Sequence, residues 1–188
     1  MAAILLPAAA IANEFLERSG RDQRPVTPMQ LLKLVYIADG WYLAVTGNPL
    51  FEEPVQAWRY GPVVSPLFHE FKEYGGGAIR KLAHVPVPTG DDPFEFSLDA
   101  PFVPKGDTDK LQLLEWVWKT YGSMSGIQLS NLTHQPGTPW WNARERMKKE
   151  NVENKRPEES WTSHCVIPNA DIRQHYVDLW NKRNARPA

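Results

Sequence analysis

Two short stretches of the sequence place large aromatic side chains and arginine beside a proline turn. The first, WRYGPVV, contains Trp58, Arg59, Tyr60 and Pro62, and the second, TPWWNARER, contains Trp140. Tryptophan, tyrosine and arginine are enriched at the energetic centres of protein–protein interfaces. The same side chains also pack well at the edges of small domains, and composition alone slightly favours packing. The two stretches are therefore candidates for a binding surface or for the rim of the core.

The histidines are not spaced for metal binding or nucleophilic catalysis. No two of them lie four residues apart, and His164 directly precedes the single cysteine, Cys165, which is poor geometry for a nucleophile and its base. Signatures such as GxGxxG, GxxxxGK[ST], HExxH and GxSxG are absent. His134 follows Thr133 at a proline–glycine turn, where both side chains can hydrogen bond to the backbone. We expect a structural role for His134, and no catalytic residue, metal site or cofactor.

Length and composition describe an ordinary globular protein. The 188 residues fit one domain, and 42% hydrophobic and 23% charged residues are typical values. The net charge of −1 shows no basic excess, so nucleic-acid binding is not expected. The apolar N-terminus lacks the basic start of a signal peptide, and the longest apolar stretch, 31–45, is interrupted by Lys33 and Asp39. We expect a cytoplasmic protein that does not associate with a membrane.

Hydrophobic periodicity and capping signals predict a mainly helical fold. In the segment 27–46, Thr27 and Gln30 form a capping box, Pro28 suits the first turn, and Gly47 ends the helix. Apolar residues on almost all sides of this segment predict a buried central helix. Further helices are expected at 8–19, 65–74, 107–121, 127–134, 139–149 and 169–183.

Side-chain pairing and burial are also predicted for two of these helices. In the first helix, Glu14 and Arg18 form a pair four residues apart, worth about 0.2–0.5 kcal/mol on a helix surface. In the last helix, Ile172, Tyr176, Leu179 and Trp180 are expected to be buried.

Strand signals are fewer. Residues 55–60 alternate roughly as a strand, and the stretches IRKLAHVPV and FEFSLD flank the turn PTGDDP. The region 78–105 is therefore expected to form a small hairpin or a variable insertion, and 151–160 an exposed polar loop. The predicted fold class is mainly α (α+β): a single compact helical domain, with its core at about 8–183, around a buried central helix and with a small antiparallel β-hairpin or sheet.

The stretch LVYIADGWYLAVTGNPLFEEPVQAWRYGPVV resembles the core signature of the Panacea family, the SocA-like and GepA-like proteins of bacteria and their phages. The signature is carried by residues 33–44, 46–51 and 57–63, with Asp39 where the family often has histidine. A second block is present at 129–134 and at Pro139 and Trp140, and a terminal helix block at 167–176. The resemblance covers roughly residues 10–180.

This resemblance implies a mostly helical antitoxin module without catalytic residues. Members neutralise partner toxins of different kinds by binding them, and in the SocA-like branch neutralisation is tied to handing the toxin to a housekeeping protease. The expected partner is a cognate toxin encoded by an adjacent gene, with a protease complex as a second partner.

The resemblance also favours the binding interpretation of the aromatic stretches. We expect Gly61 and Pro62 to shape a turn that presents the preceding aromatic and arginine side chains near a groove, with Trp140 close by. The predicted partner-binding residues are Trp58, Arg59, Tyr60, Pro62, His134 and Trp140.

Two other functions stay open from the residues alone. One is a hydrolase, metal-independent or based on His134, with Asp39 or Glu70 as the acidic partner. The other is a DNA-binding autoregulator that uses 125–134 as a helix-turn element. A bound metal or ligand would favour the first, and binding that weakens steeply with salt would favour the second.

Overall fold

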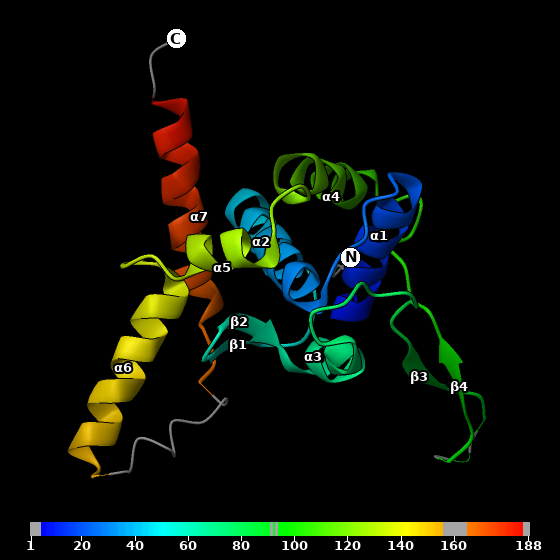
Figure 1. The fold of residues 1–188 in the computed structure, drawn as a ribbon, viewed down its shortest axis with the longest axis horizontal. Coiled ribbons are helices and arrows are strands. Elements are labelled where there is room, and N and C mark those ends of the chain that lie inside the picture. The colour runs from blue at the N-terminus through cyan, green and yellow to red at the C-terminus, as the bar shows by residue number, and fades with distance from the viewer. Residues whose placement is uncertain (1–4, 91, 93, 156–164, 186–188) are drawn as a thin grey trace.

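The fold is mainly helical, as predicted. The computed structural model describes residues 5–90, 92, 94–155 and 165–185. Figure 1 shows α2 in the middle of the molecule, with α1 and α4 on one side of it and α5 and α7 on the other. The α-helices of the described part are α1 (Ala8–Arg21), α2 (Pro28–Thr46), α3 (Ser65–Phe71), α4 (Thr108–Tyr121), α5 (Gly126–Thr133), α6 (Pro139–Glu153) and α7 (Asn169–Asn184).

The helix α2 is the buried centre that its sequence predicts. The side chain of Thr27 accepts a hydrogen bond from the Gln30 amide, and the Gln30 side chain accepts one from the Thr27 amide, which completes the capping box. Gly47 ends the helix in the left-handed conformation, with φ of 76°. Because α1, α4, α5, α7 and β2 (Gly61–Val64) all contact α2, its ten residues from 31 to 40 are buried on every side.

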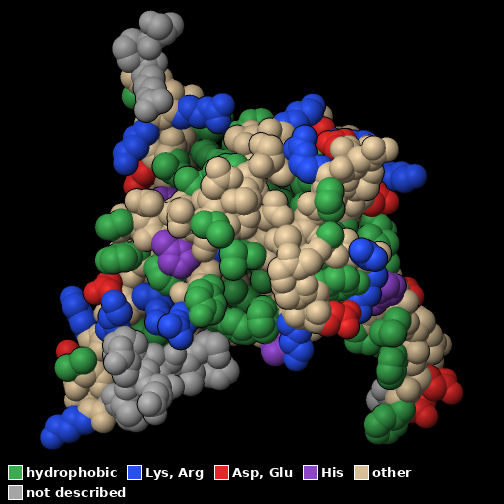
Figure 2. Space-filling model, viewed as in Figure 1, with side chains coloured by type: hydrophobic (Ala, Val, Ile, Leu, Met, Phe, Trp, Pro, Cys, Tyr) green, Lys and Arg blue, Asp and Glu red, His purple; other side chains and the backbone are tan. Residues whose placement is uncertain are grey.

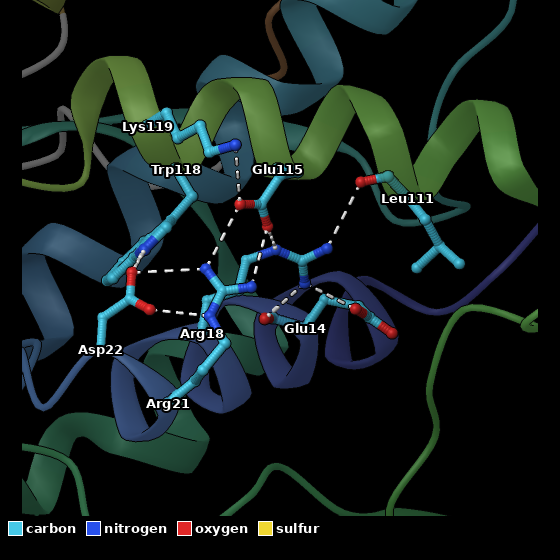
Figure 3. Close-up of polar contacts among 8 residues, drawn as sticks. All are labelled: Glu14, Arg18, Arg21, Asp22, Leu111, Glu115, Trp118 and Lys119. Carbon is cyan, nitrogen blue, oxygen red and sulfur yellow. Dashed lines mark hydrogen bonds and ion pairs between the residues drawn. The ribbon is translucent and has the colours of Figure 1, made fainter.

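A buried ion-pair cluster joins α1 to α4, which the sequence did not predict (Figure 3). Arg18 donates to the Glu14 carboxylate at 2.6 Å and to the Glu115 carboxylate at 3.1 Å, and it also reaches the carbonyl oxygen of Leu111. Glu14 and Arg18 are both buried, whereas Arg21, which also binds Glu115, is exposed. The predicted pair therefore exists within α1, but it is buried, and Arg18 also joins α1 to α4 through Glu115 and Leu111.

A hairpin replaces the single strand predicted at 55–60. The strand β1 (Val55–Trp58) pairs antiparallel with β2, with Trp58 opposite Gly61, so the turn consists of residues 59 and 60. Gly61 and Pro62 were predicted to shape the turn, and that prediction is wrong because they begin the return strand. Gly61 does adopt a backbone that favours glycine, with φ of 112°. The segment after α6 joins the other side of β1, where the Ala57 amide donates to the Cys165 carbonyl at 2.7 Å.

The expected hairpin within 78–105 is present as β3 (Val85–Pro88) and β4 (Phe96–Asp99). It projects away from the helices beside α1 in Figure 1, and its side chains contribute little to the core. Its base is fixed to α1, because the Asn13 side chain donates to the carbonyl oxygens of Ala83 and Pro101. A short 3-10 helix, η1 (Lys72–Tyr74), follows α3.

The ends of α6 and α7 differ from the sequence-based expectation. The helix α6 continues through residues 151–153, and Asn151 is buried, so only 154 and 155 of the predicted loop are non-helical; residues 156–160 lie outside the described residues. On α7, Ile172 and Tyr176 are buried as predicted, but Leu179 and Trp180 are exposed, Trp180 by 50%. Figure 1 shows why: the C-terminal half of α7 extends past the other helices.

No helix in the described ranges combines the length and apolar character needed to cross a bilayer.

Candidate functional site

The two aromatic stretches meet in the structure. Thr138 caps α6 by accepting a hydrogen bond from the Trp141 amide, which places Trp140 in the first turn of the helix. From there the indole Nε1 of Trp140 donates to the carbonyl oxygen of Trp58 at 2.8 Å. The buried Trp140 therefore holds the end of β1 directly before the exposed turn.

His134 supports the same turn from α5. Its Nδ1 donates to the Ser130 carbonyl oxygen at 2.5 Å, and its ring lies 3.9 Å from the ring of Trp140, centroid to centroid. The Ser130 hydroxyl in turn donates to the carbonyl oxygen of Tyr60 at 3.3 Å. Thr133 also donates to Ser130, at 2.8 Å. These contacts give His134 the structural place in the α5–α6 turn that its sequence context suggests.

The structure brings the six predicted binding residues together but exposes them unequally. Arg59 and Tyr60 project from the turn, and the Tyr60 side chain is 66% exposed, with the Arg59 guanidinium 5.5 Å from its ring centroid. Trp58 is half-buried, whereas Pro62 and Trp140 are buried. The predicted set thus divides into two residues that present surface and others that position them.

Lys33 belongs to this site, although the sequence marked it only as a break in an apolar stretch and as the first residue of the family signature. Its side chain extends from α2 to β2, where Nζ donates to the Pro62 carbonyl oxygen at 3.1 Å. Lys33 is 2% exposed, and burial lowers its pKa to about 7. A β-carbon at Gly61 would lie 2.6 Å from Nζ of Lys33 and 3.0 Å from Cε1 of His134. The absence of a side chain at Gly61 therefore makes room for this amine.

A groove of about 530 Å³ lies beside the turn, between the start of α2, the β1–β2 hairpin and α3, and we name it the Lys33 groove. Among its described lining residues there is no aspartate or glutamate. On the face seen in Figure 2, hydrophobic side chains gather over the middle of the molecule and basic side chains lie at the edges of that area. The apolar wall of the groove includes Met29, Leu32, Trp58, Val63 and Phe68, and its cations are Lys33, Arg59, Lys72 and Arg144.

Neither acidic residue considered as a partner of His134 is hydrogen bonded to it in the described part of the chain. Asp39 is buried and accepts a hydrogen bond from the Leu50 amide at 2.8 Å, and burial raises its pKa to about 6. Within the described residues, no hydrogen bond joins Asp39 or Glu70 to His134, whose Nδ1 is engaged by Ser130. The same part of the chain contains no group of three or more histidine, cysteine, aspartate or glutamate residues placed to hold a metal ion.

Sequence comparison defines the class to which this fold and site belong. The chain belongs to the family described as antitoxin SocA-like, Panacea domain, which matches residues 31–141. The matched range contains most of α2, the β1–β2 hairpin, α5 and Trp140, and so includes every predicted binding residue.

A curated relative supports the same class. Antitoxin SocA of Caulobacter vibrioides (strain NA1000 / CB15N) is 31% identical to this chain over 134 residues, which are 71% of this chain and 68% of that protein. No solved structure matches the chain. The predicted family resemblance is confirmed, and the chain is antitoxin-like.

Proposed function

We propose that this protein is an antitoxin that neutralises a cognate toxin by binding it directly at the turn of residues 59 and 60. The observation that carries the proposal is the support of an exposed arginine–tyrosine pair by hydrogen bonds to the backbone carbonyl oxygens around it. Trp140 holds the carbonyl oxygen before the pair, Ser130 holds the carbonyl oxygen of Tyr60, and Lys33 holds that of Pro62. A rigid surface loses little conformational entropy on binding, which favours affinity.

The partner is expected to be a protein. Both side chains that project from the turn are of types enriched in interface hot spots, and the groove beside them is mainly apolar. The family name and the curated relative support a toxin as that protein. Delivery of the bound toxin to a housekeeping protease is a second step that the same binding would permit.

Growth rescue followed by co-purification tests the proposal. Each adjacent open reading frame is expressed in a heterologous bacterium with and without this protein. One neighbour is expected to be toxic, to be neutralised by this protein, and to co-purify with it. Relief without a stable complex that is lost in a protease-deficient host would identify delivery to the protease as the main route. If no neighbour is toxic, the antitoxin function is wrong.

Two substitutions locate the interface. Arg59→Glu and Tyr60→Ala leave the supporting hydrogen bonds in place, because these are made by backbone carbonyl oxygens, and each is expected to weaken toxin binding by about tenfold or more. Arg173→Glu is the matched control. Arg173 is exposed beside Gly47, which ends α2. The groove lies at the start of α2, and this helix is about 28 Å long. Toxin bound equally well by all three variants would show that the interface lies elsewhere.

A further inference from the structure

Lys33 lines the groove, and its buried amine uses only part of its hydrogen-bonding capacity. An ammonium group has three donors, and the described contacts of Lys33 include one hydrogen bond, to Pro62. No described carboxylate pairs with it. A buried charge is normally paired, since desolvation without a partner is unfavourable. The site therefore provides a position for an anion that the described part of the chain does not supply.

The remaining cations of the groove are available as well. Arg59, Lys72 and Arg144 line it, and none of them forms an ion pair with a carboxylate in the described ranges. They come from three different elements, the β1–β2 turn, η1 and α6, and so surround the groove on several sides. Four positive groups around an apolar wall are complementary to a ligand that is both acidic and apolar.

We propose that the Lys33 groove receives a segment of the partner toxin in which apolar side chains alternate with aspartate or glutamate, and that one of these carboxylates forms an ion pair with Lys33. This inference rests on the proposed function for the identity of the partner. The residue types expected in the bound segment follow from the residues that line the groove. A segment with several side-chain carboxylates matches four cations better than a single C-terminal carboxylate does. The apolar side chains of the segment lie against Met29, Leu32 and Phe68.

Selection from a displayed library of random peptides, each about a dozen residues long, tests the chemistry of the groove without the toxin. Peptides recovered on the wild-type protein are expected to be enriched in aspartate or glutamate beside leucine, isoleucine or phenylalanine. A synthetic copy of the strongest peptide is expected to bind Lys33→Met at least about tenfold more weakly. Replacing its acidic residues with amides is expected to cause a similar loss, whereas amidating its C-terminus is expected to have no effect.

A matched variant and a melting curve exclude trivial explanations. Lys105→Met removes an exposed lysine just before α4. This part of the chain lies away from the groove, because Lys110 of α4 contacts the ring of Tyr42 in the second half of α2, whereas the groove lies at the start of α2. Lys105→Met is expected to bind the peptide as the wild type does. Lys33→Met keeps a side chain of similar length but removes the donor to the Pro62 carbonyl oxygen, so thermal melting checks that the variant folds.

The outcomes separate this inference from the proposed function. Absence of acidic enrichment, equal peptide binding by Lys33→Met, or dependence on the peptide C-terminus would each overturn the inference. A toxin bound equally by the wild type and by Lys33→Met would also overturn it while leaving the antitoxin function intact. Lys33-dependent peptide binding without any toxic neighbour would support the groove chemistry and contradict the antitoxin function.

Discussion

At the scale of single residues, the burial of Lys33 disfavours its charged form. Burial lowers its pKa from the usual value near 10.5 to about 7, so below about pH 7 the folded protein must bury an ammonium group. Such a position lowers the stability of the fold, so a role in binding would account for it. A binding partner that supplies a carboxylate provides such a role, because it compensates the charge only in the complex.

The pH dependence of stability tests this account. Because the folded pKa is lowered, the unfolded state binds more protons between about pH 7 and pH 10.5, and stability rises with pH in that window. Relative to Lys33→Met, the wild type is therefore expected to lose about 1.4 kcal/mol of stability for each pH unit that the pH is lowered between about 10.5 and 7. Denaturant unfolding at several pH values measures it.

The control for this prediction is Lys105→Met, whose stability relative to the wild type should not vary with pH in this window. The titratable groups that line the groove with Lys33 are Arg59, Tyr60, Lys72 and Arg144, and His134 lies beside Gly61 near the Lys33 amine. All five are kept in both proteins, so the difference between the two proteins reports Lys33. A constant difference between wild type and Lys33→Met across the window would contradict the lowered pKa.

At the scale of elements, the clamp between α1 and α4 depends on Arg18. Removing its guanidinium leaves the buried carboxylate of Glu14 without its partner at 2.6 Å. Arg18→Met is expected to lower the free energy of unfolding by about 3–5 kcal/mol, because an uncompensated buried charge is strongly destabilising. Urea unfolding measures the loss.

Two further variants isolate the cause of that loss. The double variant Glu14→Gln with Arg18→Met removes both charges and is expected to recover much of the stability. Arg21→Met, on the same helix and also bound to Glu115, is expected to change stability little, because its guanidinium is exposed to solvent. Equal losses for Arg18→Met and Arg21→Met would show that the buried pair is not the stabilising feature.

The sequence predicted elements far better than their packing. The start of α2 was predictable because the capping box at Thr27 involves residues three apart, and this box is present. The β1–β2 hairpin was missed because Gly61-Pro62 is a typical turn pair, and only pairing with β1 shows it to be a strand. Trp58 and Trp140 are 82 positions apart in the sequence, and a local sequence pattern cannot predict a contact between residues so far apart.

The site was predictable to the same extent. Arg59 and Tyr60 could be identified as candidates for a binding surface from their residue types alone, because arginine and tyrosine are enriched at interface hot spots. The burial of Lys33 was not predictable, since it depends on the empty space at Gly61, which lies on another element. The groove itself arises from α2, α3, the hairpin and α6 together, so it exists only at the level of the assembled fold.

At the scale of the whole molecule, the core and the β3–β4 hairpin make separate contributions. The hydrophobic core gathers around α2, whereas the hairpin exposes its large side chains, with Phe94 86% exposed. The Lys33 groove includes no residue of the hairpin. We therefore expect the hairpin to be a dispensable insertion, and the remaining chain to carry both the stability and the toxin-binding surface.

Removing the hairpin tests this division. Val85 and Asp99 are opposite each other in the register, so residues 86–98 can be replaced by Asn-Gly, which favours a tight hairpin turn. The contacts of Asn13 with Ala83 and Pro101 remain and keep the base of the hairpin on α1. The shortened protein is expected to melt within a few degrees of the full chain and to rescue growth equally well. Lost rescue in a protein that still melts cooperatively would place part of the toxin-binding surface on the hairpin, because unfolding would then be excluded as the cause.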